Sequence, residues 1–251
     1  MIKLKSGREI KLMREAGKIV AEVLEEMEST IKPGLTTAKL DKIAEKLIRS
    51  YGAEPAFLGY HNFPASICAS INNEVVHGIP GLRRLEEGDI ISIDVGVRLN
   101  GYHGDAAATF GVGEITPQAA KLIKTTKVSL QKAVEAMQAG NRLSDISHAV
   151  QAYVESNSLS VVRNYVGHGI GEDMHEEPQV PNFGTPGRGP VLKEGLVLAI
   201  EPMVNIGSWD VKVLDDQWTV VTADGSLSAH FEHTVALGNN GPEILTSSNL
   251  V

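Results

Sequence analysis

Two aspartates lie on either side of a short turn in the first half of the chain. Asn100-Gly101 is a strong signal for a two-residue hairpin turn, and a hairpin around it places Gly96 opposite Asp105. Because side chains alternate along a strand, Asp94 and Asp105 become diagonal neighbours on one face, roughly 5–8 Å apart at Cβ. This spacing favours a shared divalent cation, although a solvated Asp105 and a strand-capping Asp94 are the other interpretation.

Two glutamates strengthen the interpretation as a metal site. Glu201 directly follows the apolar run 196–200, and Glu232 is expected in the middle of a strand over 228–237. A charge at such a position is disfavoured unless it is paired, and few lysines or arginines lie nearby. Four acids of this kind need cations, and oxygen ligands that bridge two ions suit a two-metal hydrolytic site.

Three of the eight histidines are candidates for chemistry. His168 lies between Gly167 and Gly169, which leave the imidazole accessible, so it is interpreted as a metal ligand. His77 and His175 have no ligand partner at short spacing and are candidate acids or hydrogen-bond donors. Four other histidines are interpreted as structural: His103, which is expected to be exposed beside the turn, His148 on a helix, and His230 and His233 beside Glu232.

The elements that must position these residues repeat in order. Helices are predicted over roughly 7–29, behind a capping box formed by Ser6 and Glu9, and from Thr37 to near Gly52. Strands are predicted at 66–77 and 89–98, helices at 117–140 and from 144, and strands at 160–166, 196–206, 217–223 and 228–238. The segment 87–94 is echoed by 194–201, each with a Glu-Gly turn, an apolar strand and a final acid. This order predicts a duplicated α/β unit.

The composition excludes several classes of protein. The chain has 251 residues, a net charge of −8 and 42% hydrophobic residues, which argues for a globular protein and against nucleic acid as the main ligand. A single cysteine, Cys68, excludes an intramolecular disulfide and fits a reducing cytosol. No signal peptide is visible, and no window approaches the roughly 18 apolar residues of a membrane span. The expectation is a cytoplasmic protein without a membrane segment.

The metal-site candidates occur along the chain in the same order as the metal ligands of a known family. Asp94, Asp105, His168, Glu201 and Glu232 resemble the metal-binding pentad of the type I methionine aminopeptidases. The surrounding strings match too: Asn73-Glu74-Val75-Val76-His77-Gly78-Ile79-Pro80, Gly167-His168-Gly169-Ile170-Gly171, His175-Glu176-Glu177-Pro178, Ile200-Glu201-Pro202-Met203 and Phe231-Glu232-His233-Thr234. The resemblance covers residues from about 5 to 240. It implies the pita-bread fold, a pseudo-twofold α/β (α+β) architecture with a curved antiparallel sheet and helices on its outer face.

The resemblance implies one catalytic domain, residues 1–251, with halves at about 6–112 and 113–251. It implies two divalent ions per chain, for which Co, Mn, Fe, Zn and Ni are all candidates. Asp94 would bind one metal, Asp105 and Glu232 would bridge both, and His168 and Glu201 would complete the shell of the other. A bridging hydroxide would attack the scissile carbonyl, with Glu201 as proton acceptor and shuttle.

The same resemblance implies how a substrate would be held. His175 would bond the scissile carbonyl oxygen, and His77 would contact the scissile amide. Tyr60, Cys68 and Trp218 match the pocket that lines the methionine side chain. Phe63, Phe57 and Met174 depart from the usual residues, a Tyr, a Cys and a Phe, but keep that pocket apolar.

The implied activity is removal of the initiator methionine from nascent proteins whose second residue is small and uncharged. The expected substrates are nascent peptides that start with Met, and the expected state is a cytoplasmic monomer, with contact to the ribosome left open. One alternative is a related Xaa-Pro peptidase, although such enzymes usually carry an extra N-terminal domain and the first helix is expected near residue 7. Another is an inactive binding module of the same fold, although that would be expected to have lost some of the ligands.

Overall fold

The computed structural model describes residues 1–247, so residues 248–251 of the expected domain lie outside the described part. The helices are α1 (Gly7–Thr30), α2 (Thr37–Ser50), α3 (Pro117–Ala136) and α4 (Leu143–Ser156), with a 3-10 turn at Tyr60–Asn62. The strands of the first half are β1 (Glu54–Pro55), β2 (Cys68–Ile71), β3 (Glu74–Val76), β4 (Ile90–Leu99) and β5 (Tyr102–Gly111). Those of the second half are β6 (Ser160–Val161), β7 (Gly167–Gly169), β8 (Glu176–Val180), β9 (Val197–Ile200), β10 (Met203–Asn205), β11 (Val211–Val213), β12 (Val220–Thr222), β13 (Ser228–His230), β14 (His233–Gly238) and β15 (Gly241–Ile244).

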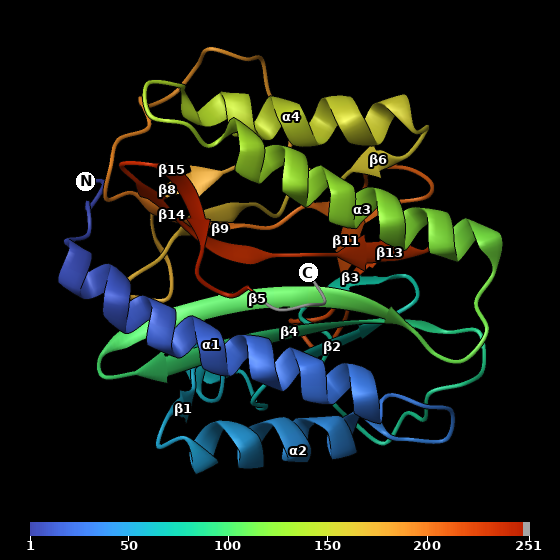
Figure 1. The fold of residues 1–251 in the computed structure, drawn as a ribbon. Helices are drawn as coiled ribbons and strands as arrows, with labels where there is room; N and C mark the ends of the chain where they lie inside the picture. Colours follow the sequence, from blue (N-terminus) through green and yellow to red (C-terminus); the bar gives the residue numbers. More distant parts are fainter. Residues whose placement is uncertain (248–251) are drawn as a thin grey trace.

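The helices cover two opposite sides of a layer of strands (Figure 1). Helices α1 and α2 lie on one side and α3 and α4 on the other, which matches the expected order of two helices and then strands in each half. Helix α1 begins at the predicted capping box: the Glu9 amide donates to the Ser6 hydroxyl, and the Ser6 amide donates to the Glu9 carboxylate. Among the described residues, every helix is too short or too polar to span a membrane.

The strands form antiparallel sheets that join edge to edge. One sheet contains β1, β4, β2 and β5, and another runs in the order β15-β14-β9-β7-β8. The smaller sheets are β13-β10-β6 and β11-β12-β3. The two halves meet where the Glu232 amide donates to the Ala107 carbonyl at 2.9 Å and the Ala107 amide returns a bond at 3.4 Å. Strand β5 of the first half is thus bonded directly to the chain beside Glu232 in the second half.

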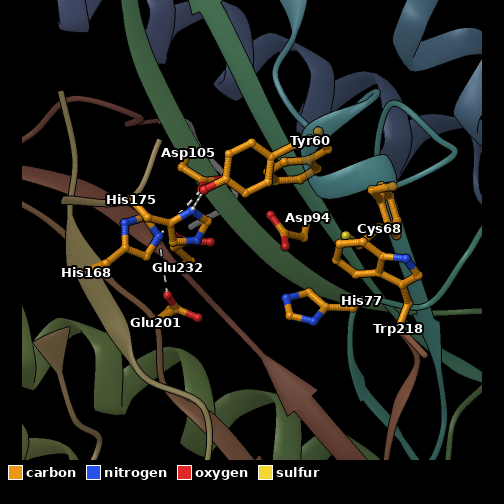
Figure 2. A pocket seen from close by; sticks show the side chains of 12 residues that line it. Tyr60, Cys68, His77, Asp94, Asp105, His168, His175, Glu201, Trp218 and Glu232 are labelled. Carbon is orange, nitrogen blue, oxygen red and sulfur yellow. Dashed lines mark hydrogen bonds and ion pairs between the residues drawn. The ribbon is translucent and has the colours of Figure 1, made fainter. Parts of the chain in front are cut away.

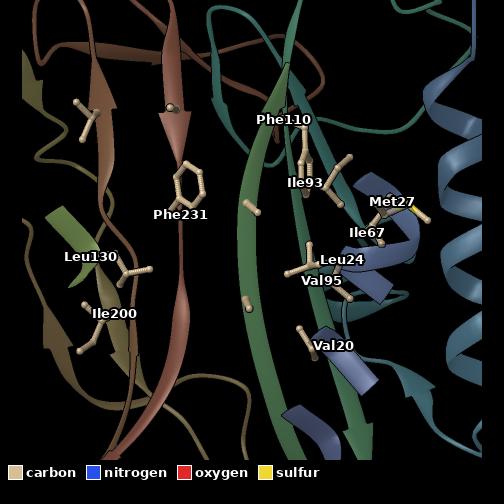
Figure 3. Close-up of a cluster of buried hydrophobic side chains, with 14 of the residues drawn as sticks. Val20, Leu24, Met27, Ile67, Ile93, Val95, Phe110, Leu130, Ile200 and Phe231 are labelled. Atoms are coloured by element: carbon tan, nitrogen blue, oxygen red, sulfur yellow. The ribbon is translucent and has the colours of Figure 1, made fainter. Parts of the chain in front are cut away.

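The β4–β5 hairpin has the register that the Asn100-Gly101 turn predicts. Leu99 pairs with Tyr102, and Gly96 pairs with Asp105. Figure 3 shows Ile93 and Val95 on β4 directed toward helix α1, together with buried Val20 and Leu24. Because side chains alternate, Asp94 faces the other side of the sheet, away from this apolar layer.

The strands of the second half are shorter than predicted. The expected run 196–206 breaks at Glu201-Pro202, where proline cannot donate to a ladder, and the run 228–238 breaks at residues 231–232. The prediction that Glu232 lies within a strand is therefore wrong: it lies between β13 and β14. Likewise the run 66–77 is two strands, separated by a turn in which Asn72 has a φ of 57°.

Candidate active site

The structure brings the candidate site residues together around one cavity. It is lined by Phe57, Tyr60, Phe63, Cys68, His77, Asp94, Asp105, His168, His175, Glu201, Trp218 and Glu232. Figure 2 shows the cavity with Glu201, His168 and His175 at one end and with Cys68 and Trp218 at the other. These residues come from both halves of the chain, and the cavity has a carboxylate-rich end and an apolar end.

The two aspartates come from the hairpin, one from each strand. Asp94 lies in β4, and Asp105, which is 4% exposed, lies opposite Gly96 in β5. Burial raises the pKa of Asp94 to about 7. Burial, together with the nearby charges of Glu232 and Asp94, raises the pKa of Asp105 well above its usual range. Both shifts show that the folded chain places these carboxylates where negative charge is costly without a cation.

The two glutamates reach the same place from breaks between strands. Glu201 follows β9, and its carbonyl accepts a hydrogen bond of 2.9 Å from the side chain of Asn182. Glu232 follows β13 and is 2% exposed. Burial, followed by repulsion from the neighbouring acids, raises the pKa of each glutamate well above its usual value. Four carboxylates therefore converge on one end of the cavity, and those of Asp105 and Glu232 are buried.

His168 presents a bare ring nitrogen to these carboxylates. Its Nδ1–H donates to the carbonyl of Gly169 at 2.9 Å, which leaves Nε2 without a proton in the neutral ring. Nε2 lies 3.7 Å from Oε1 of Glu201 and 4.0 Å from Oδ2 of Asp105. Burial, with the nearby His175, lowers the pKa of His168 to about 3, so the ring stays neutral. A hydrogen bond that fixes the tautomer of an imidazole in this way is typical of metal-ligating histidines.

The donor atoms at this end fit a divalent cation. One ligand atom from each of Asp105, His168 and Glu232 lies within 4.8 Å of the others. Within residues 1–247, Oδ1 of Asp94, Oδ1 of Asp105 and Oε1 of Glu232 are buried without a hydrogen-bond partner. None of the residues that line the cavity in this part of the chain is a lysine or arginine. Buried acceptors with no donor to satisfy them, beside one neutral imidazole, indicate a site for a divalent metal.

Two further histidines border the cavity. The ring of His175 lies 4.1 Å from that of His168, and its Nδ1 is 2.7 Å from the hydroxyl of Tyr60. His77 has a φ of 61°, an unusual conformation for a residue with a side chain, and burial lowers its pKa to about 4. Burial also lowers the pKa of His175. Both rings are therefore neutral near pH 7 and can each donate one hydrogen bond.

Aromatic rings form the other end of the cavity. The rings of Phe63 and Trp218 meet edge to face with centroids 5.0 Å apart, and Trp218 also contacts His77 at 6.1 Å. Burial raises the pKa of the Cys68 thiol well above its usual value, so the thiol stays protonated and is a poor nucleophile. Met174 does not line the cavity in the described chain but packs in a cluster behind it, with Phe57 and Tyr60.

Two other histidines differ from the expectation. His103 was expected to be exposed, but it is 7% exposed, with Nδ1 bonded to the carbonyl of Gly171 at 3.1 Å. That prediction is wrong because the turn folds against another loop. His230 was interpreted as structural, yet its Nε2 lies 3.7 Å from Oε2 of Glu201 and 4.0 Å from Oε2 of Glu232. Its position two residues before Glu232, on the same side of an extended chain, was the signal that could have identified it.

Comparison with known proteins identifies the class to which this site belongs. The model of metallopeptidase family M24 matches residues 11–239. A methionine aminopeptidase of Clostridium acetobutylicum is 62% identical over 247 residues, which cover 98% of this chain and 99% of the relative. A methionine aminopeptidase of Clostridium perfringens is 60% identical over 246 residues, with the same coverage of 98% and 99%. The chain therefore belongs to metallopeptidase family M24, whose members hydrolyse peptide bonds.

Within that family the similarity is to methionine aminopeptidases in structure as well as in sequence. The crystal structure of methionine aminopeptidase from Rickettsia prowazekii superposes with a TM-score of 0.97 at 43% identity. The match covers 98% of this chain and 100% of that chain. The expected pita-bread fold is thus confirmed.

Proposed function

We propose that this protein removes the N-terminal methionine from nascent proteins whose second residue is small and uncharged. The observation that carries this proposal is one cavity with four carboxylates at one end and aromatic side chains at the other. A cavity of this kind suits an apolar side chain beside a hydrolytic centre. The similarity to methionine aminopeptidases supports the choice of methionine as the residue that is removed.

The metal would be held by the five residues of the carboxylate-rich end. We propose that these residues, Asp94, Asp105, His168, Glu201 and Glu232, hold two divalent ions per chain. When bound, divalent metal supplies Lewis acidity and lowers the pKa of water toward neutrality. Four carboxylates and one imidazole accept Co, Mn, Fe, Zn or Ni, so availability in the cell would decide which ion is bound.

Glu201 is proposed as the proton carrier of the reaction. Its carboxylate lies at the carboxylate-rich end of the cavity, within reach of the water that would attack the peptide bond. It accepts a proton from the attacking water and returns it to the nitrogen of the leaving amine. The shortened peptide leaves with a neutral amine, so Glu201 gives back the same number of protons that it took up.

The two border histidines are proposed to hold the scissile peptide. With the Tyr60 hydroxyl donating to Nδ1 of His175, the neutral ring carries its proton on Nε2. That N–H can donate to the scissile carbonyl oxygen as negative charge develops on it. His77, on the other side of the cavity, contacts the scissile amide. Both act on the substrate and are proposed as catalytic residues together with Glu201.

The apolar end is proposed to bind the methionine side chain. Tyr60, Phe63, Cys68 and Trp218 surround this space, and a thioether packs well against aromatic edges. Phe57 completes the wall, with Met174 behind it.

We also propose that residues 1–251 form one catalytic domain with halves of about 6–112 and 113–251. The protein is proposed to act as a cytoplasmic monomer, and its proposed substrates are nascent peptides that start with Met.

Hydrolysis of defined peptides tests this function. The purified protein would be incubated with Met-Gly-Met-Met, with Met-Lys-Met-Met and with an Xaa-Pro peptide, each before and after treatment with a chelator. Release of methionine from the first peptide alone, its loss on chelation and its return on adding back one metal at a time are the expected results. Cleavage of only the Xaa-Pro peptide would assign the site to a different peptidase. Lack of cleavage of any peptide under every metal would leave only a binding role.

A further inference from the structure

His230 lies close to two of the carboxylates of the site, those of Glu201 and Glu232. The residue is 1% exposed, and the lining of the cavity in the described chain does not include it. Neither ring nitrogen has a hydrogen-bond partner within residues 1–247. Burying a polar group without a partner destabilises the folded state, so an imidazole held here without a role would be unfavourable.

Glu201 lies between two imidazoles, one facing each of its oxygens. Oε1 is 3.7 Å from Nε2 of His168, and Oε2 is 3.7 Å from Nε2 of His230. The two rings differ in the partner of Nδ1. His168 is fixed with its proton on Nδ1, so its Nε2 can only accept. His230 has no such bond, so its Nε2 is free to carry the proton and to donate it toward Glu201.

The backbone of His230 is held on both sides. Its amide donates to the hydroxyl of Thr109 at 2.9 Å, and that hydroxyl donates to the carbonyl of His230 at 2.8 Å. The hydroxyl of Ser92 lies 2.8 Å from that of Thr109 and supports it from β4. On the other edge, His230 pairs with Met203, two residues after Glu201. The imidazole is therefore carried by a rigid strand beside the chain segment that it would orient.

We propose that His230 is a positioning residue of the metal centre, which donates Nε2–H to Oε2 of Glu201 and so directs Oε1 toward the metal and His168. The proposal rests on the proposed function, because it assumes that Glu201 is a metal ligand. His230 is placed behind the ligands and not among them, because all five proposed ligands line the cavity in the described chain and His230 does not. Partners that orient ligands from behind typically change metal affinity or activity 10–100-fold.

Metal binding by two variants tests the proposal. Full-length protein stripped with chelator would be titrated with MnCl2 alone, for the wild type, His230→Gln and His230→Leu. Gln keeps an N–H donor, whereas Leu fills the space without one. We expect the dissociation constant for Mn²⁺ to rise about 10–100-fold in His230→Leu and to stay near the wild-type value in His230→Gln. In the reloaded enzymes, kcat should fall in the same order while KM changes little, because His230 does not reach the substrate.

Asn205→Leu is the matched control for general damage to the core. Asn205 is fully buried in β10 of the same sheet, and its Oδ1 is also without a partner in the described chain. This variant should bind Mn²⁺ as the wild type does. Equal Mn²⁺ affinity in His230→Leu and the wild type would overturn the positioning role. So would an absorption spectrum of the Co²⁺ form that changes as much in His230→Gln as in His230→Leu, because that indicates direct ligation.

The tautomer of His230 gives a test that needs no stable variant. In a long-range 1H–15N spectrum of the wild-type protein loaded with diamagnetic Zn²⁺, His230 should carry its proton on Nε2 and His168 on Nδ1. A proton on Nδ1 of His230 overturns the proposal even if His230→Leu does not fold. A wild-type protein that binds no divalent metal would instead refute the proposed function. The two failures are therefore distinguishable.

Discussion

The two halves of the molecule place their acidic side chains in the same cavity in different ways. In the first half, Asp94 and Asp105 project from β4 and β5, which pair without interruption from Ile90 and Gly111 to the turn at Leu99 and Tyr102. In the second half, Glu201 and Glu232 stand where strands stop. The short aspartates are thus placed by strand alternation, and the longer glutamates by the ends of strands.

The difference shows what each half requires for a defined carboxylate position. A continuous ladder fixes the direction of an aspartate through its own backbone. A glutamate at a break needs separate support, which Glu232 receives from the Ala107 carbonyl and Glu201 from the side chain of Asn182. His230, beside both glutamates, fits the same need. We therefore expect the second half to depend more on neighbouring side chains than the first.

The largest effect is expected from removing one charge in each half. Asp105→Asn and Glu232→Gln keep the shape of the side chain but weaken metal binding. Each should lower kcat/KM by about a thousandfold or more, since the metal contributes several kcal/mol and each 1.36 kcal/mol is a factor of ten. Peptide hydrolysis under saturating metal measures the loss, and circular dichroism checks the fold. Near-normal turnover in Asp105→Asn alone would show that only the second half holds the metal.

The same two substitutions should not lower the stability of the metal-free protein. Each variant removes a buried negative charge from a cluster in which charge is costly, so the metal-free variants should unfold at a Tm no lower than that of the metal-free wild type. The metal-loaded wild type should be the most stable form, because a ligand that binds only the folded state stabilises it. A drop in Tm of the metal-free Asp105→Asn protein would contradict the cost assigned to this cluster.

The difference between the halves also explains which features the sequence could predict. The hairpin turn, Asn100-Gly101, dictates a register, so the placement of Asp94 beside Asp105 followed from local rules. The capping box at Ser6 was equally local. By contrast, the breaks around Glu201 and Glu232 arise from contacts between distant segments, such as the bonds between residues 107 and 232. Periodicity in a single stretch contains no information about such contacts, so these strands were predicted too long.

The histidines show the same limit. His168 was recognised because glycines on both sides mark it in the sequence. His230 has no such local mark, and its closeness to Glu201 depends on the pairing of β10 with β13. His103 was misplaced because its cover comes from the loop at Gly171, which is far away in the chain. The sequence therefore predicts features that depend on neighbouring residues, whereas contacts between distant segments are visible only in the structure.

A second prediction concerns the two substrate-facing histidines, which come from opposite halves. His175→Ala should lower kcat about 10²–10³-fold, since it removes a donor that acts on developing charge. His77→Ala should have a similar or smaller effect, with a larger share in KM if it mainly contacts the ground-state amide. Steady-state kinetics with Met-Gly-Met-Met separates the two parameters. Unchanged kcat in His175→Ala would remove it from the carbonyl-binding role, while Tyr60→Phe serves as the milder control.

A third prediction compares two glycines in close backbone contacts. A Cβ on Gly17 in α1 would lie 2.3 Å from the Leu245 carbonyl oxygen, and one on Gly167 in β7 would lie 2.4 Å from that of Ala199. Each change to Ala should cost about 1–3 kcal/mol, because the backbone must move to admit it. Only Gly167→Ala should also lower kcat, since the next residue is His168. Thermal unfolding and activity per folded molecule test this, and equal loss of kcat in both variants would contradict it.

The smallest effects are expected at the first helix cap of each half. Ser6 accepts from the Glu9 amide at the start of α1, and Thr116 accepts from the Ala119 amide at the start of α3. Replacing either by Ala should cost about 1 kcal/mol, which lowers Tm by about 2–4 °C for a chain of this size. Ser6→Ala should cost slightly more, because the Ser6 hydroxyl also donates to Glu9 at 2.6 Å. Neither cap contacts the cavity, so kcat should stay unchanged in both; a fall in kcat for Ser6→Ala would mean that the N-terminal segment also positions the site.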